Sequence, residues 1–533
     1  MSHNVISRRT PAGTIHVVDP SPFNWLHVLE NTMEAPVKAD RNGRVIPALA
    51  AGLKWVDDCI LEMRLRERLV FQDGQRLTSK SVKENFKELQ RWPSPHSFGS
   101  WLNFHEETKI IIVDEHTVQL QFPYPDGLVP GKLRFFHIAA SNFWRKIGFG
   151  YAKQGTGDGH WSMLDAPGPW GSGPFSLTDG HSSILSQTAI VKKNPFASAW
   201  LTLREDRSPY IVLQANQNYW NPIRSSKLER VIFRNDLSYD HALRVCTSTE
   251  GQVDLVTGVL PKDAEKVVRS PYTRLVNEKG NQVIAGIFNL FRRDVNFSDR
   301  KLRLAFNLAI DREEIVRKGF KGYADLVPAL TPSWAADFPE NLQPRQSNPA
   351  RARQLLKNAR WRQGRPVKLA STEKYQTIAR LIASQLRTNL QIEAEVTIVQ
   401  TDQELSFLKT IAEKKLVPNW DIFLTDATAS FSEDTPFYVH REFFGSSGAL
   451  RAGPKLVDFD QLYKRMVIQT DRKNRINRAK AIDQFIFEQA YALFLCIPQS
   501  LYAVNKQVHF TPYKTMLDLA ETEVTEKHWS RRR

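Results

Sequence analysis

Cysteine is scarce in this sequence. The 533 residues include only three, Cys59, Cys246 and Cys496, and no two of them form a CxxC pair. Zinc ribbons need such pairs, and disulfide scaffolds need a denser set of cysteines, so both classes of protein are excluded. The HExxH motif of zinc proteases is also absent, and the 13 histidines are scattered along the chain. The sequence therefore predicts neither a metal site nor a cofactor.

Long apolar runs are missing as well. No stretch reaches the roughly 18 apolar residues that a membrane-spanning helix needs. The N-terminus, MSHNVISRRTPAGTIHVVDPSPF, has an arginine pair but lacks the apolar stretch of about 7–15 residues that follows in a secretory signal. We therefore expect the chain as written to be cytoplasmic. If a leader was removed or is missing, the expected location is the periplasm or the cell envelope.

The usual enzyme signatures fail in their details. The segment GLVPGKL (Gly127–Leu133) has one residue too few between its glycines for a P-loop, and Leu133 stands where a serine or threonine must reach magnesium. The segment GTGDGH (Gly155–His160) lacks the glycine spacing of a dinucleotide site. No GxSxG nucleophile elbow occurs. We therefore expect a protein that is not an enzyme.

Positive charge is abundant. Lys+Arg 73 against Asp+Glu 57 leaves a formal net charge of +16, which favours anionic partners. Seven of the basic residues fall in residues 348–368, which predict either a solvated helix face or a docking site for an anionic partner. No helix-turn-helix, RNP sequence or zinc finger accompanies them, so we expect no nucleic-acid partner.

The composition is otherwise that of a globular protein, with 41% hydrophobic and 24% charged residues. Between Ile15 and Gln121 the pattern predicts an α+β lobe. In it, Asp73-Gly74 forms a type I′ hairpin turn, and Thr78 caps a helix that buries Val82, Phe86 and Leu89. From Arg300 onward the pattern alternates helices with strands, which indicates a second, α/β lobe. Helices are expected at 349–360, 374–388, 402–415 and 471–490, and strands at VKLAS, AEVTIV and DIFLTD.

Residues 146–175 are rich in glycine, proline and tryptophan, which predicts a long ordered loop or a domain seam. Many of the 13 tryptophans also stand beside Gly, Pro, Asn or Ser. Tryptophans in loops either pack against the core or line a ligand cleft, where a flat ring supplies contact area with little loss of entropy.

A series of short blocks then runs through the chain in a fixed order. Together they resemble the family-5 solute-binding proteins, the large receptors of ABC importers for peptides, nickel chelates and related solutes. The resemblance extends from about Gly13 to Lys506. Its blocks are GRVIPALAAGLKW, LRERLVFQDGQRLTSKSV, GSGPF, QANQNYWN, LERVIFR, GQVDLV, FNLFRRDVNFSDRKLRLAFNLAIDREEIV, NPARARQLLKNARW and FIFEQAYALFLCIP.

The resemblance implies an α/β, periplasmic-binding-protein-like clamp of type II, in the large variety whose first lobe has an extra subdomain. Lobe I would take residues 1–283, including a subdomain at about 45–170 and an insert at 176–210. Lobe II would take residues 284–493, and residues 494–533 would return to lobe I. Hinge closure around the solute would then involve Val283–Asn289 and Phe494–Pro498.

The resemblance also implies which residues meet the solute. Peptide-binding members hold the peptide's amino group with an aspartate after the strand equivalent to WDIFL. That place falls near Ser430 here, and Asp426, Glu433 or Asp434 would have to substitute for the aspartate.

In nickel-chelate binders an arginine contacts the ligand's carboxylate. The aligned position is Phe136, with Arg134 and His137 as its neighbours. Trp101 matches a tryptophan that faces the chelate. The predicted ligand-binding residues are therefore Trp101, Arg134, His137, Asp426 and Ser430.

We thus expect a monomeric solute-binding protein without catalytic activity. It would enclose a peptide-like, carboxylated or metal-chelate solute and work with an ABC permease. The alternative is a cytoplasmic, clamp-fold subunit for interaction or sensing that docks on a partner protein through its basic helices.

Overall fold

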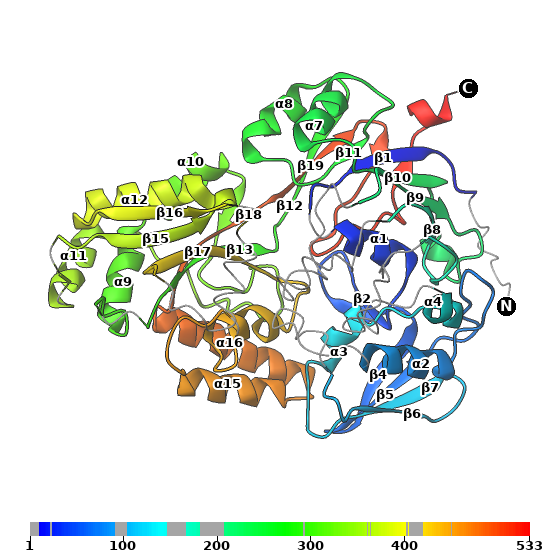
Figure 1. Cartoon of the computed structure of the whole chain (residues 1–533), viewed down its shortest axis with the longest axis horizontal. Coiled ribbons are helices and arrows are strands. Elements are labelled where there is room, and N and C mark those ends of the chain that lie inside the picture. Colours follow the sequence, from blue (N-terminus) through cyan, green and yellow to red (C-terminus); the bar gives the residue numbers. More distant parts are fainter. Residues whose placement is uncertain are drawn as a thin grey trace.

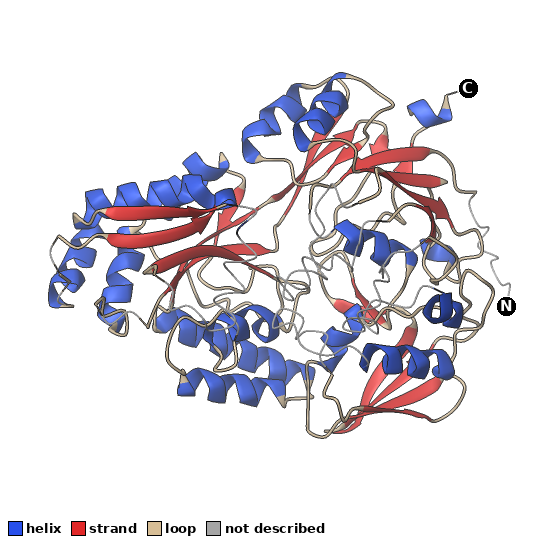
Figure 2. Cartoon of the chain, in the orientation of Figure 1, coloured by secondary structure: helices blue, strands red, loops and turns tan. Residues whose placement is uncertain are grey.

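The computed structural model describes residues 10–21, 24–90, 104–146, 167–181, 207–291, 294–359, 361–362, 364–400, 403, 419–448 and 450–532. These residues form two bodies that lie side by side (Figure 1). We call the body around a seven-stranded sheet lobe I and the body around a six-stranded sheet lobe II. The predicted α/β class is confirmed, since both lobes combine sheets with covering helices (Figure 2).

The large sheet of lobe I has the N-terminal strand at its centre. β1 (Thr14–Val18) pairs in parallel with β10 (Arg230–Arg234) and β11 (Leu255–Val256). Its alternating residues Ile15 and Val17 are fully buried, as period-two patterning requires. The remaining strands are β8 (Phe175–Asp179), β9 (Tyr210–Ala215), β12 (Thr273–Glu278) and β19 (Ser500–Asn505). The helices of this lobe include α1 (Asn24–Thr32), α7 (Tyr239–Ser248) and α8 (Ala264–Arg269).

A smaller antiparallel sheet lies at the bottom of lobe I in Figure 1, with α2 (Ser79–Gln90) on one face. Its strands are β4 (Ala50–Asp57), β5 (Ile60–Leu65), β7 (Thr117–Gln121) and β6 (Lys109–Ile112). Helix α2 starts directly after Thr78 and buries Val82 and Phe86, as predicted, whereas the side chain of Leu89 is outside the described part.

The predicted type I′ turn at Asp73-Gly74 is wrong. That turn needs positive φ at both positions, but only Gly74 has it, at 86°. Asp73 instead accepts a hydrogen bond from the Gln75 backbone N–H through its side chain, at 2.9 Å. The turn is therefore shaped by an aspartate side chain, which a dipeptide pattern does not reveal.

Lobe II has one mixed sheet between two groups of helices. Its strands are β13 (Gln282–Phe288), β14 (Ala324–Leu326), β15 (Val367–Thr372), β16 (Ala394–Val399), β17 (Ile422–Thr428) and β18 (Ala492–Pro498). The predicted strands VKLAS, AEVTIV and DIFLTD are confirmed as β15, β16 and β17. One face packs against α9 (Arg300–Ala309), α10 (Arg312–Phe320), α11 (Pro349–Asn358) and α12 (Gln376–Leu390). The other packs against α15 (Val457–Val467) and α16 (Arg472–Glu488). The predicted helix at 402–415 falls outside the described residues, apart from residue 403.

The chain passes between the two large sheets twice, and the two passages are neighbours. Antiparallel pairing joins β12 to β19 in lobe I and β13 to β18 in lobe II, so the passages at residues 279–281 and at Gln499 lie together. At Gly280 a Cβ atom would stand 1.8 Å from the Pro498 carbonyl oxygen, so no side chain fits there. The predicted boundaries between the lobes, at residues 283 and 494, stay predictions. Both residues lie within strands of the lobe II sheet, β13 and β18.

Three arginines meet the end of α16, and of these Arg303 is buried. Arg345, Arg300 and Arg303 donate to the backbone carbonyls of Phe487, Glu488 and Gln489, at 2.5, 2.5 and 2.7 Å. These carbonyls have no partner within the helix, and the helix dipole makes this end negative. Burial lowers the pKa of Arg303 to about 10, which still leaves it charged.

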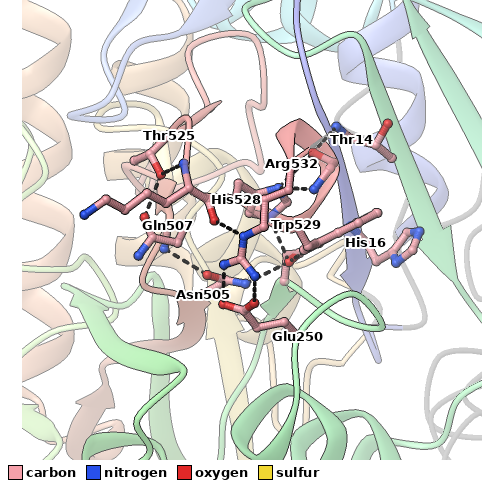
Figure 3. A network of polar contacts seen from close by, with 12 residues as sticks. Thr14, His16, Glu250, Asn505, Gln507, Thr525, His528, Trp529 and Arg532 are labelled. Atoms are coloured by element: carbon pink, nitrogen blue, oxygen red, sulfur yellow. Dashed lines mark hydrogen bonds and ion pairs between the residues drawn. The ribbon is translucent and has the colours of Figure 1, made fainter.

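The last residues of the chain return to lobe I and close on β1 (Figure 3). Their anchor is Asp254, which is fully buried. Its carboxylate accepts hydrogen bonds from His528 Nε2 and Trp529 Nε1 at 3.0 and 2.9 Å, from Asn505 Nδ2 at 3.0 Å, and from the His16 backbone N–H at 2.9 Å. Among the described helices, none has the length and apolar character needed to cross a membrane.

We expect Asp254→Ala to lower the free energy of unfolding by roughly 3 kcal/mol, because it leaves several buried donors without an acceptor. Urea unfolding followed by circular dichroism measures the change. Asp179→Ala, at the exposed end of β8, is the matched control and should change stability by no more than about 0.5 kcal/mol. Equal stabilities of the two variants would contradict the role given to Asp254.

Candidate ligand site at the seam between the lobes

The predicted ligand residues come from both lobes. Arg134 lies in a short 3-10 turn (Leu133–Phe135) of lobe I, and His137 follows it. Asp426 lies on β17 of lobe II, and Ser430 lies in the loop after that strand. Trp101 is outside the described residues.

Arg134 and Ser430 are in direct contact across the seam. The Arg134 side chain is only 4% exposed. It donates to the Ser430 backbone carbonyl, to Glu30 Oε1 at 2.9 Å and to the Thr515 carbonyl at 3.3 Å. Arg134 is thus already neutralised by a carboxylate of its own lobe, and Ser430 takes part through its backbone instead of its hydroxyl group.

Asp426 is engaged elsewhere. Its carboxylate accepts hydrogen bonds from the Tyr375 hydroxyl at 2.5 Å and from Lys374 Nζ at 3.3 Å, both within lobe II. The two proposed substitutes are occupied as well. Glu433 pairs with Arg472 Nε at 2.6 Å, and Asp434 pairs with Arg475 Nε at 2.8 Å. The contacts of these three carboxylates therefore do not include Arg134 or His137.

A small cavity of about 30 Å³ lies beside Arg134 and His137. It offers room for a water molecule or two. The residues that line it include three carboxylates, three cations and His137. The carboxylates are Glu30, Glu34 and Asp518, and the cations are Lys38, Arg134 and Arg224. Since Arg134 lines this cavity and also touches Ser430, the cavity lies next to the seam.

Most of these charges already have partners. Glu30 pairs with Arg134, and Asp518 pairs with Arg224. Glu34 accepts hydrogen bonds from the Tyr219 hydroxyl and Trp220 Nε1, both at 2.6 Å, and from the Ser172 hydroxyl at 3.0 Å. Burial raises the pKa values of both Glu30 and Glu34.

Lys38 is different. It lies on β2 (Val37–Ala39) between two buried apolar residues, and it lines the cavity. Within the described part of the chain its ammonium group has no ion pair. Burial, and then the charge of Arg224, lowers its pKa to about 8.

His137 is a neutral donor or acceptor in this wall. Burial, and then the positive charge of Arg134, lowers its pKa to about 4. At neutral pH the cavity therefore presents an uncharged imidazole and one ammonium group that lacks a counter-ion in direct contact.

Sequence reasoning missed Lys38 together with Glu30, Glu34 and Asp518. The only signal for Lys38 is a single lysine in the otherwise uncharged run APVKA. Such a residue is more often a solvated one, so the signal is weak. Among the described residues, no group of three or more His, Cys, Asp or Glu side chains is arranged to hold a metal ion.

Comparisons with a family profile, curated proteins and solved structures all find solute-binding proteins. The profile described as "Bacterial extracellular solute-binding proteins, family 5 Middle" matches residues 44–448. Among curated proteins, the glutathione-binding protein GsiB of Salmonella typhi is 23% identical over 386 residues. The match covers 70% of this chain and 65% of that protein. GsiB of Escherichia coli O157:H7 is 22% identical over 386 residues, and the match covers the same fractions of the two chains.

Solved structures show the same fold over nearly the whole chain. The ABC transporter substrate-binding protein CtaP of Listeria monocytogenes has a TM-score of 0.77 at 17% identity, covering 97% of this chain and all of that one. NikA of Brucella suis, in complex with Fe(III)-EDTA, has a TM-score of 0.75 at 17% identity and covers 96% of this chain. A putative peptide-binding protein AppA of Clostridium difficile has a TM-score of 0.75 at 16% identity and also covers 96%.

These findings confirm the predicted two-lobed clamp and do not favour a docking subunit. The cytoplasmic expectation gains no support from a family described as extracellular. The profile covers most of the chain. The chain belongs to family 5 of the bacterial extracellular solute-binding proteins.

Proposed function

We propose that this protein is the substrate-binding component of an ABC-type transport system and that it works outside the cytoplasm. It binds solute without catalysing a reaction and hands it to a membrane permease. The observation that carries the proposal is a charged cavity beside the seam of two lobes, which two adjacent passages connect among the described residues. A clamp of this kind closes around its ligand by rotation about the passages.

The names of the relatives and the charges in the cavity wall together indicate the ligand class. Glutathione, peptides and EDTA, the molecules in the names of the relatives, all carry carboxylates. Lys38 is the cation that would receive such a group, since Arg134 and Arg224 are held by Glu30 and Asp518. We therefore propose a carboxylated, peptide-like solute of which only the carboxylate group enters this small cavity and meets Lys38 and His137. Trp101, Arg134 and Ser430 would border the site, and Asp426 would lie further away.

A solute panel tests this function. The purified protein is screened by thermal unfolding against short peptides, glutathione, amino acids and metal chelates, and native mass spectrometry detects any solute that it retains. At a hundredfold excess over Kd, a ligand stabilises the folded form by about 2.7 kcal/mol, which raises Tm measurably. No shift from any class, together with no retained solute, would contradict the proposal.

We expect Lys38→Met to weaken the binding of a carboxylated solute about tenfold, which corresponds to about 1.4 kcal/mol. Methionine keeps an unbranched side chain that is one atom shorter, and it removes the ammonium group with its charge and its hydrogen-bond donors. Isothermal titration calorimetry measures the change in Kd. The control is Lys54→Met, at an exposed lysine of the same lobe, which should leave Kd unchanged. If both variants bind as the wild type does, Lys38 is not the carboxylate partner.

The same ammonium group makes binding depend on pH. The pKa of Lys38 is about 8, so the group is mostly protonated at pH 7 and mostly neutral at pH 9. The neutral form should bind a carboxylate about as weakly as Lys38→Met does, so affinity should fall about fivefold between pH 7 and pH 9. Calorimetry at the two pH values measures this fall, and the Lys38→Met variant should not show it. A flat profile in the wild type would argue against Lys38.

A further inference from the structure

A cluster of charged side chains lies inside lobe II, and none of its members lines the cavity beside Arg134. We call it the acid cluster. It gathers residues from the loop after β17, from the helical turn Pro436–His440, from α16 and from the loop between β14 and α11. Its members are Asp337, Glu433, Asp434, His440, Arg472, Arg475 and Asp483. All except Arg472 are at most 4% exposed, so their charges must balance one another within the protein.

Two of the four carboxylates are balanced by arginines. Arg475 Nε donates to Asp434 Oδ1 at 2.8 Å. Arg472 Nε lies 2.6 Å from Glu433 Oε2. Arginine keeps its proton in proteins, so each pair has a permanent positive partner for its carboxylate. The other two carboxylates have no arginine of their own.

His440 can balance at most one of these two. Its Nε2 lies 2.6 Å from Asp483 Oδ1, and both side chains are fully buried. A protonated imidazole would neutralise Asp483 and leave Asp337 without a cation. A neutral imidazole would leave both carboxylates without one. In either case Asp337 is the carboxyl group for which the described residues supply no ion pair.

The surroundings of Asp337 disfavour a negative charge. Its side chain is fully buried. Its Oδ2 accepts one hydrogen bond, from the Thr435 backbone N–H at 3.1 Å, and Oδ1 has no hydrogen-bond partner among the described residues. Burial, and then the charges of Asp483 and Asp434, raises the pKa of Asp337 well above its usual value. An unpaired carboxylate in such a place takes up a proton, because its desolvation is too costly.

The remaining charges near the cluster do not supply the missing cation. Lobe I contributes Asp126, whose charge acts on Asp434, but Asp126 already pairs with Lys132 Nζ at 2.5 Å. In the described part of the chain, the acids of the cluster do not form a group arranged to hold a metal ion. A proton on Asp337 therefore remains as the means of balance.

We infer that Asp337 is kept as a protonated carboxyl group inside lobe II and that it makes the stability of the protein sensitive to pH. The inference goes beyond the proposed function and holds for any solute. In the unfolded chain Asp337 loses its proton at about pH 4, whereas the folded protein retains it. Its contribution to stability is therefore complete below about pH 4 and declines as the pH rises, until the folded form ionises too.

Asp337→Asn tests the inference, since it keeps the shape of the side chain and removes the ionisable group. Urea unfolding followed by circular dichroism at pH 5 and pH 6 gives the folding equilibrium constant of each protein. Between these values the constant of the wild type should fall about tenfold more than that of the variant. Other titrating groups are common to both proteins, so the difference isolates Asp337. Equal falls in the two proteins would overturn the inference.

The matched control is Asp458→Asn, at an exposed aspartate of α15 in the same lobe. This side chain is exposed to water, so the variant should show the same fall between pH 5 and pH 6 as the wild type. If Asp458→Asn flattened the pH dependence as Asp337→Asn does, the effect would not belong to the acid cluster, and the inference would fail.

Infrared spectroscopy observes the proton directly, because a protonated carboxyl group absorbs at a higher frequency than a carboxylate. We expect the wild type at pH 6 to show such a band, which shifts when aspartate is labelled with carbon-13 in its side-chain carboxyl group. Asp337→Asn should lower its intensity. If that variant does not fold, the labelled wild type decides, and the lack of any aspartate carboxyl band at pH 6 would overturn the inference. Neither measurement uses a solute, so failure here is distinct from failure of the solute panel.

Discussion

The structure depends on the pairing of two strand ribbons that run from one lobe into the other. β12 and β13 carry the chain out of lobe I, β18 and β19 bring it back, and antiparallel hydrogen bonds tie the two passages together. Backbone pairing fixes their register and leaves no space for a side chain at Gly280. In the described part of the chain these passages are the covalent links between the lobes, so the lobes are otherwise coupled by contacts at the seam, and those contacts can break.

Not all of the positive charge of the molecule lies on its surface. Several arginines are buried and donate to backbone carbonyls, as Arg303 does at the end of α16 and Arg134 does at the seam. A guanidinium group serves this purpose well, because it presents five donors and loses its proton only at high pH. The surplus of +16 thus includes structural cations that no external partner sees.

The elements of the fold could largely be predicted because their signals are local. Asp299 and Asp311 cap α9 and α10 through hydrogen bonds to Lys301 and Glu314, two and three residues further on. The site could be predicted only in part. Arg134 and Ser430 were singled out separately, yet their contact spans 296 positions in the sequence. Asp426 was nominated as a substitute for the aspartate that peptide-binding members carry after this strand, but its carboxylate is bound by Tyr375 and Lys374.

The sequence by itself therefore determined the two-lobed architecture, the order of its elements and the family, because caps, periodicity and ordered motifs are properties of short segments. The tertiary structure alone decided which charges remain available at the seam. Arg134 meets Glu30 and Thr515 across 104 and 381 positions, and these contacts satisfy it, while Lys38 keeps no such partner among the described residues. Pairing over such distances depends on how the chain folds back on itself, and no local pattern encodes it.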